Sequence, residues 1–123
     1  MTLGRFLAAR TRRLAMAVRY TLAGLGHALR TERPFQEEAL CLVLIVIPGA
    51  VWLGTTGVER ALMVGSWLLV LVVELLNAAV ERTVDRIGLE RHELSGRAKD
   101  LGSAAVGVAI VLALVVWGLI VFG

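Results

Sequence analysis

The chain has 123 residues, of which 58% are hydrophobic and 19% charged, and its formal net charge is +3. A water-soluble domain of this length buries too little of its surface to accommodate so large an apolar fraction, so the sequence predicts a membrane protein. The same composition excludes a disordered chain, and the single cysteine excludes a disulfide scaffold.

The first expected element is a helix over residues 4–31 that lies on the membrane surface. Its large apolar residues recur at spacings that place them on one helix face: Leu7, Leu14, Val18, Leu22, Leu25 and Leu29. Several arginines fall largely on other faces, a pattern typical of an interfacial amphipathic helix. The first helix of a soluble core is the alternative interpretation. We expect no signal peptide, since no short apolar region with a cleavage site begins the chain.

Three apolar runs follow, and we expect membrane-spanning helices over residues 35–53, 60–81 and 100–122. A hydrocarbon core of about 30 Å needs about 20 helical residues, which the second and third runs supply. The first run is interrupted at Pro48-Gly49 and must include Phe35–Glu38 or lie where the bilayer is thinner. The expected fold is therefore an all-α membrane protein, with residues 1–123 forming a single domain.

The basic residues predict the orientation of the chain. All 13 except Arg60 fall before the first span or in the connection expected at about residues 81–100. Because cytoplasmic segments carry an excess of Lys and Arg, we expect the N-terminus and this connection in the cytoplasm and the C-terminus outside. Their position beside apolar runs indicates anionic lipid headgroups or phosphorylated substrates as partners, and no nucleic acid.

The second span carries an unusual set of polar residues. Glu74 lies inside the apolar run, where an ionisable group is a functional candidate by default. At about 100° per residue, Asn77, Glu81 and Asp85 share its helix face. Such a stripe suits a hard divalent cation, and its innermost carboxylate suits a general base. Two structural alternatives remain: Glu81 and Asp85 at a solvated helix end paired with neighbouring arginines, and Asn77 joining two helices.

The segment before the third span adds further candidates. Arg97 and Lys99 are suited to hold phosphates and Asp100 to share a metal, although a plain charged loop is the alternative. Neither a Walker loop nor a kinase glycine loop is present. With one cysteine and two histidines in the chain, a zinc site is not expected. The small residues from Gly102 to Gly107 favour close helix packing, and Ser103 is a candidate polar contact.

Two stretches carry a specific resemblance. Residues 73–86 read VELLNAAVERTVDR, and residues 92–105 read HELSGRAKDLGSAA. These motifs resemble the signature of the prokaryotic diacylglycerol kinases, and the similarity extends from about Arg13 to the end of the chain. The resemblance implies a homotrimeric kinase of the bacterial inner membrane. It would transfer the γ-phosphate of MgATP to the primary hydroxyl of diacylglycerol, giving phosphatidic acid.

The resemblance also implies roles for individual residues. Glu74 matches the catalytic base, with Asn77 at a polar active-site position. Glu32 and Glu81 match the carboxylates that bind Mg²⁺ and nucleotide. The other nucleotide contacts are Arg13, Tyr20, Glu90, Arg91, His92, Lys99 and Asp100. The lipid-substrate contacts are Arg13, Glu37, Glu38, Glu74 and Ser103.

The sequence departs from the family pattern at a few positions. Ala78 stands where the family usually has Ser or Thr, and Leu22 replaces an aromatic residue expected on the surface helix. Arg33-Pro34 and Arg91 are also unusual. An undecaprenol kinase with the same machinery is the nearest alternative function. A small ion or proton transporter and a non-catalytic membrane scaffold are alternatives from other classes.

Overall fold

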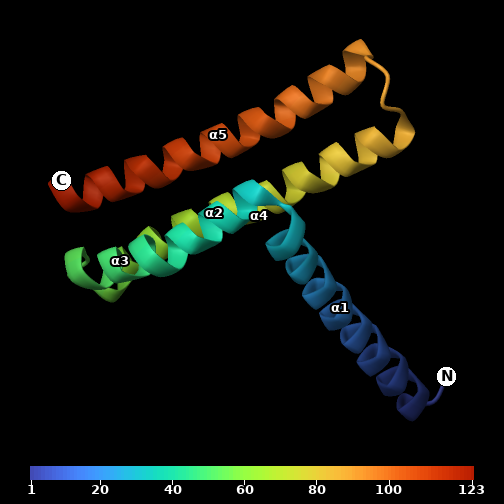
Figure 1. The fold of residues 1–123 in the computed structure, drawn as a ribbon. Helices are drawn as coiled ribbons and strands as arrows, with labels where there is room; N and C mark the ends of the chain where they lie inside the picture. The colour runs from blue at the N-terminus through green and yellow to red at the C-terminus, as the bar shows by residue number, and fades with distance from the viewer. The chain divides into compact units, whose positions relative to one another are not determined.

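The computed structural model describes all 123 residues as helices and short connections, with no strand. The chain divides into two units, residues 1–33 and 34–123, which are described separately. Figure 1 shows the helices of both units. The all-helical fold class expected from the sequence is confirmed, while the expected assignment of the chain to one domain stays a prediction.

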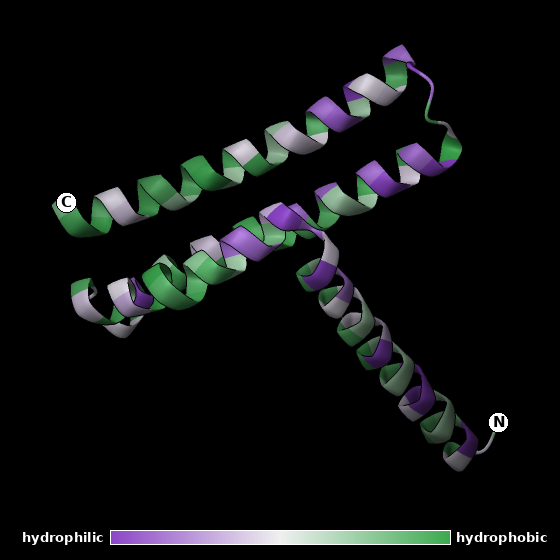
Figure 2. Cartoon of the chain, in the orientation of Figure 1, coloured by the Kyte–Doolittle hydropathy of each residue, from purple (hydrophilic) through white to green (hydrophobic).

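The first unit is dominated by α1, Leu3–Thr31. Thr2 caps its start, because its side-chain oxygen accepts a hydrogen bond from the backbone N–H of Arg5. The helix carries no acidic residue, and most of its side chains are exposed. Hydrophilic and hydrophobic residues alternate around it (Figure 2), as expected of an amphipathic helix.

Three helical segments, which belong to the second unit except for Arg33, are long and apolar enough to cross a membrane: Arg33–Leu53, Gly57–Ile87 and Glu93–Phe122. The first consists of α2 (Arg33–Cys41), η1 (Leu42–Val46) and α3 (Ile47–Leu53). The other two are α4 (Gly57–Ile87) and α5 (Glu93–Phe122). The three expected spans lie within these helices, and their limits relative to the bilayer stay predictions.

The interruption expected at Pro48-Gly49 is a local change of helix type. Pro48 lacks an N–H group and would leave a carbonyl of the preceding turn without its partner in a regular α-helix. The turn before it, η1, is a π-helix, and the N–H of Ile47 donates to the carbonyl of Leu42. The wider turn accommodates the proline, so the helix continues to Leu53.

The helices continue well beyond the expected spans, so the expectation of a long connection at about residues 81–100 is wrong. A capping box of Thr56 and Glu59 begins α4, and no proline interrupts it before Ile87. His92 caps α5, since its Nδ1 accepts a hydrogen bond from the N–H of Leu94 at 3.1 Å. Only residues 88–92 connect the two helices, so most of the charged segment is helical.

The core of the second unit lies between α4 and α5, which run antiparallel side by side (Figure 1). Val70 of α4 is fully buried against Ala109 and Ala113 of α5. The small alanine side chains allow the two helix backbones to approach closely. This packing sets the register in which the polar residues of α4 meet those of α5.

Two tryptophans connect the three helical segments. Trp67 of α4 donates from Nε1 to the carbonyl of Glu38 in α2, at 2.9 Å. Trp117 of α5 donates to the carbonyl of Met63 in α4, at 3.1 Å. The ring of Trp117 also packs against Gly49, where an added Cβ would lie 2.9 Å from its Cη2 atom. Only glycine allows α3 to lie this close to α5.

Replacing Gly49 with alanine is expected to destabilise the second unit by about 1–3 kcal/mol, because the new methyl group overlaps the Trp117 ring. Unfolding in detergent micelles measures the effect. Trp117→Phe removes the outer ring, so the double variant should lose less stability than the two single changes added together. Simple additivity would contradict this account of the contact.

Candidate functional site

The buried face of α4 changes from apolar to polar along its length. Met63, Ser66 and Val70 lie on this face, followed by Glu74 and Asn77. Glu74 is only 7% exposed and Asn77 only 8%, although both side chains are polar. Buried polar groups of this kind are expensive unless they have partners or a function. Glu81 is half-buried further along, and Asp85 is exposed.

The carboxylates of this stripe do not form a metal cluster by themselves. Glu74 and Glu81 are seven residues apart on one helix, which separates their backbones by about 10 Å. No group of three or more His, Cys, Asp or Glu side chains is close enough together to hold a metal ion. Because the helical rise spreads the oxygens of the stripe, a cation here would need ligands from outside it, and the expectation that the stripe suits a cation stays a prediction.

Glu38 of α2 provides a partner for Glu74. The two carboxyl groups lie within hydrogen-bonding distance, and Glu37 is close enough to interact electrostatically with Glu38. The second oxygen of Glu38, Oε2, is buried and has no hydrogen-bond partner. The pair therefore leaves an unoccupied acceptor in the interior of the second unit.

Lys99 of α5 lies opposite the charged end of the stripe. Its Nζ is 2.7 Å from a carboxylate oxygen of Asp85, and both side chains are about half-exposed. Lys99 also interacts electrostatically with Glu81. Lys99 on the neighbouring helix is thus a partner of Asp85. The structural alternative from the sequence had paired Glu81 and Asp85 with neighbouring arginines of their own helix. Arg97, one of the phosphate candidates, pairs with Glu93 on α5.

Asn77 meets α5 at Gly102. A Cβ added to Gly102 would overlap the side-chain oxygen of Asn77 and lie 3.3 Å from its Cγ atom. That oxygen, Oδ1, is buried and has no hydrogen-bond partner. The neighbouring candidates Asp100 and Ser103 are exposed on α5.

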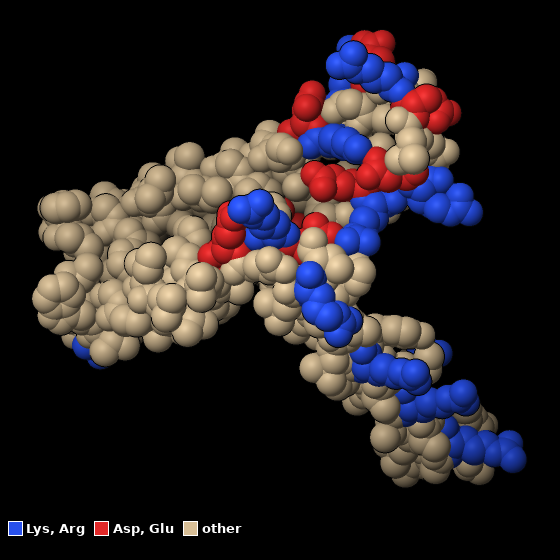
Figure 3. All heavy atoms as spheres, viewed as in Figure 1, with Lys and Arg blue, Asp and Glu red and all other residues tan.

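A hollow of about 170 Å³ lies at the connection between α4 and α5. Glu90, Arg91, His92 and Lys99, all expected nucleotide contacts, line it together with Asp85. Charged side chains of both signs gather at this end of the two helices, whereas their apolar lengths are largely free of charge (Figure 3). The hollow therefore combines cations, carboxylates and an imidazole in a position that polar ligands can reach.

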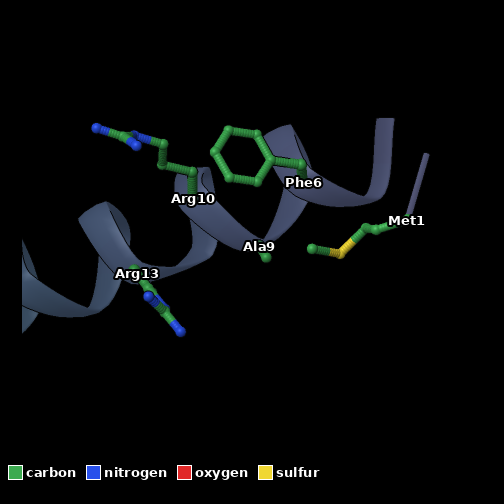
Figure 4. Close-up of a pocket in the computed structure, with 5 residues that line it drawn as sticks. All are labelled: Met1, Phe6, Ala9, Arg10 and Arg13. Carbon is green, nitrogen blue, oxygen red and sulfur yellow. The ribbon is translucent and has the colours of Figure 1, made fainter. Parts of the chain in front are cut away.

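The remaining candidates belong to the first unit. Arg13 and Tyr20 are exposed on α1, and Glu32 follows its last turn, where its N–H donates to the carbonyl of Ala28. A hollow of about 290 Å³ on α1 is lined by Met1, Phe6, Ala9, Arg10 and Arg13. Figure 4 shows Arg10 beside the Phe6 ring, with its guanidinium carbon 5.9 Å from the ring centroid. Arg10 is a basic residue that the sequence pattern did not single out as a site.

Sequence reasoning missed the contacts made across helices. The Glu38–Glu74 pair and the close approach of Gly102 to Asn77 are both of this kind. The sequence contains one feature that could have indicated each contact. Glu38 is an acidic residue at the edge of an apolar run, and Gly102 begins a stretch of small residues.

Comparison with known proteins places the chain in one family. The family model for prokaryotic diacylglycerol kinase matches residues 19–121. A diacylglycerol kinase of Haemophilus influenzae is 51% identical over 109 residues, covering 89% of this chain and 92% of that protein. Those of Pseudomonas aeruginosa and Escherichia coli K12 are 48% identical over 112 residues and 47% over 105 residues. They cover 91% and 85% of this chain and 90% and 85% of their own lengths. The chain belongs to the prokaryotic diacylglycerol kinase family and is a membrane-bound kinase.

Proposed function

We propose that this protein transfers the γ-phosphate of ATP to the primary hydroxyl of diacylglycerol, giving phosphatidic acid at the cytoplasmic face of the bacterial inner membrane. The observation that carries the proposal is the position of Glu74. It is a buried carboxyl group, paired with Glu38, on a helix that continues to a charged end. This change from an apolar to a charged helix surface suits a substrate whose acyl chains lie in the bilayer and whose hydroxyl lies near the bilayer surface.

Glu74 acts in this proposal as the general base. It accepts the proton of the lipid hydroxyl as that oxygen bonds to the γ-phosphorus of ATP, while the bond from this phosphorus to the β-phosphate oxygen breaks and ADP leaves. Glu38 holds the Glu74 carboxyl group in place through their hydrogen bond. Asn77, one turn further along α4, presents an acceptor beside it. Lys99 and the residues around the connecting hollow bind the phosphates and the nucleotide. Phosphoryl transfer depends mainly on such positioning and charge neutralisation.

The carboxylates present fit a magnesium ion delivered with ATP. Mg²⁺ is usually held by one or two protein carboxylates, with phosphate oxygens and water completing its shell. Glu81, half-buried beside Lys99, supplies a suitable oxygen ligand, and Glu32 is the second proposed ligand from the family resemblance. The ion would neutralise charge on the phosphates.

The proposal extends to assembly and orientation. Only 11% of the most apolar stretch of α5 is buried within the chain, so most of this helix faces lipid or other subunits. The family resemblance implies a homotrimer in which neighbouring chains complete each site, and this exposed surface leaves room for such contacts. The concentration of basic residues before the first span and around the α4–α5 connection supports a cytoplasmic N-terminus and an external C-terminus.

The substrate is tested by assaying the purified protein in mixed micelles with labelled ATP and either diacylglycerol or undecaprenol. We expect diacylglycerol to be the better substrate by at least an order of magnitude in kcat/KM. Preference for undecaprenol would assign the protein to the alternative function. Ion movement in liposomes without ATP consumption would support a transporter, for which the family membership gives no support.

A further inference from the structure

We infer that Gly102 is a positioning residue for Asn77 and that it sets the place of the Asn77 carboxamide in the phosphoryl-transfer site. The inference rests on the proposed function for its catalytic consequence, whereas its geometric part is independent of the substrate. Where α4 and α5 are in contact, a Cβ at Gly102 would occupy the same space as the side-chain oxygen of Asn77.

Hydrogen bonding does not hold this oxygen. Oδ1 of Asn77 is buried and has no hydrogen-bond partner, and the residue is only 8% exposed. An unpaired buried acceptor is unfavourable by about 1–3 kcal/mol, so the side chain would be expected to rotate away if another position were open. Packing therefore determines where the carboxamide lies, and the surface it packs against is the backbone of Gly102.

The position has a chemical consequence. Asn77 follows Glu74 by three residues, so the two side chains are neighbours on the buried face of α4. The unpaired oxygen is available to a hydrogen-bond donor that enters beside the Glu74 carboxyl group. A side chain at residue 102 would push the carboxamide, or the whole of α5, away from this place.

Other glycines of the same helices do not have this relation. A Cβ added to Gly107 or Gly118 on α5 would have no atom within 4 Å in this chain. Gly102 therefore differs from them in what it contacts and not in its backbone conformation, since no glycine has a positive φ. Gly107→Ala is a matched control, being the same change five residues further along the same helix.

The kinetic test is a double-mutant cycle with Gly102→Ala and Asn77→Ala. Gly102→Ala should lower kcat by about 10–100-fold with little change in KM for ATP. The added methyl group moves the Asn77 carboxamide a short way out of its position in the site, and phosphoryl transfer is sensitive to such small displacements. In the Asn77→Ala background the same change should cost nothing further, since no carboxamide remains to be displaced. Gly107→Ala should retain normal activity. An equal loss in both backgrounds would overturn the inference.

A structural readout separates this inference from the proposed function. Asn77 is the only asparagine in the chain, so selective labelling gives one side-chain amide signal in the NMR spectrum. Gly102→Ala should shift this signal and Gly107→Ala should not. An unshifted signal overturns the inference even if diacylglycerol is phosphorylated. A shifted signal supports the geometric part even if diacylglycerol proves not to be the substrate.

Folding of the variants is also informative. Alanine is a better helix former than glycine, so Gly102→Ala does not weaken α5 itself. If the single variant fails to fold, Asn77→Ala/Gly102→Ala should fold again because the overlap is gone. Failure of the double variant to fold would contradict the proposed contact.

Discussion

Replacing Glu74 with glutamine is expected to lower kcat by about 10³-fold, the range that general-base catalysis contributes. Glutamine has nearly the shape of glutamate and can still form a hydrogen bond with Glu38, so the packing of α2 against α4 is retained. What the variant lacks is a group able to take a proton from the lipid hydroxyl. Phosphoryl transfer from labelled ATP in mixed micelles measures the loss.

The control for this variant is Glu93→Gln. Glu93 is an exposed residue in the first turn of α5 to which the proposed mechanism gives no role. Its partner Arg97, a phosphate candidate from the sequence, has no role in that mechanism either. Glu93→Gln removes one negative charge, as Glu74→Gln does, but at a place where no proton transfer is proposed. The activity of this control should stay near the wild-type value. The thermal unfolding of Glu74→Gln should also stay close to wild type. Near-normal turnover in this variant would remove Glu74 from the mechanism.

Replacing Glu81 with glutamine should have a different signature. We expect about a 10–100-fold loss of activity together with a higher Mg²⁺ concentration for half-maximal rate, because an amide is a weaker ligand than a carboxylate for a hard cation. Titration of MgCl₂ at constant ATP measures both effects, and removal of the metal with a chelator should abolish turnover in the wild type.

The comparison with Glu74→Gln gives this prediction its discriminating power. Added Mg²⁺ should partly restore the Glu81 variant and leave the Glu74 variant inactive. If the Mg²⁺ requirement of Glu81→Gln equals that of the wild type, Glu81 does not bind the metal, and its interaction with Lys99 becomes the explanation for any loss.

The helices themselves follow from local properties of the chain. The apolar runs, the absence of proline within α4 and α5, and the cap residues Thr56 and His92 are all readable in sequence order. The helix ends were less predictable. Hydropathy marks where a helix can enter a bilayer, whereas hydrogen bonding decides where it stops, so α4 and α5 extend into the charged segments.

The face shared by Glu74 and Asn77 is likewise a consequence of helical periodicity. Spacing alone places them together on α4, and both are buried there. Periodicity also misleads when distance along the axis is ignored. The full stripe from Glu74 to Asp85 shares a face without its carboxylates meeting, because each residue adds about 1.5 Å of rise.

By itself, therefore, the sequence determined that this protein is a helical membrane protein, and its motifs indicated a lipid kinase. Only the tertiary structure decided which side chains meet: Glu38 with Glu74, Lys99 with Asp85 and Gly102 with Asn77. The physical reason is that helix periodicity is a local property, whereas these pairs depend on the register of helices distant in sequence. Close packing at Val70 and the hydrogen bonds of Trp67 and Trp117 set that register.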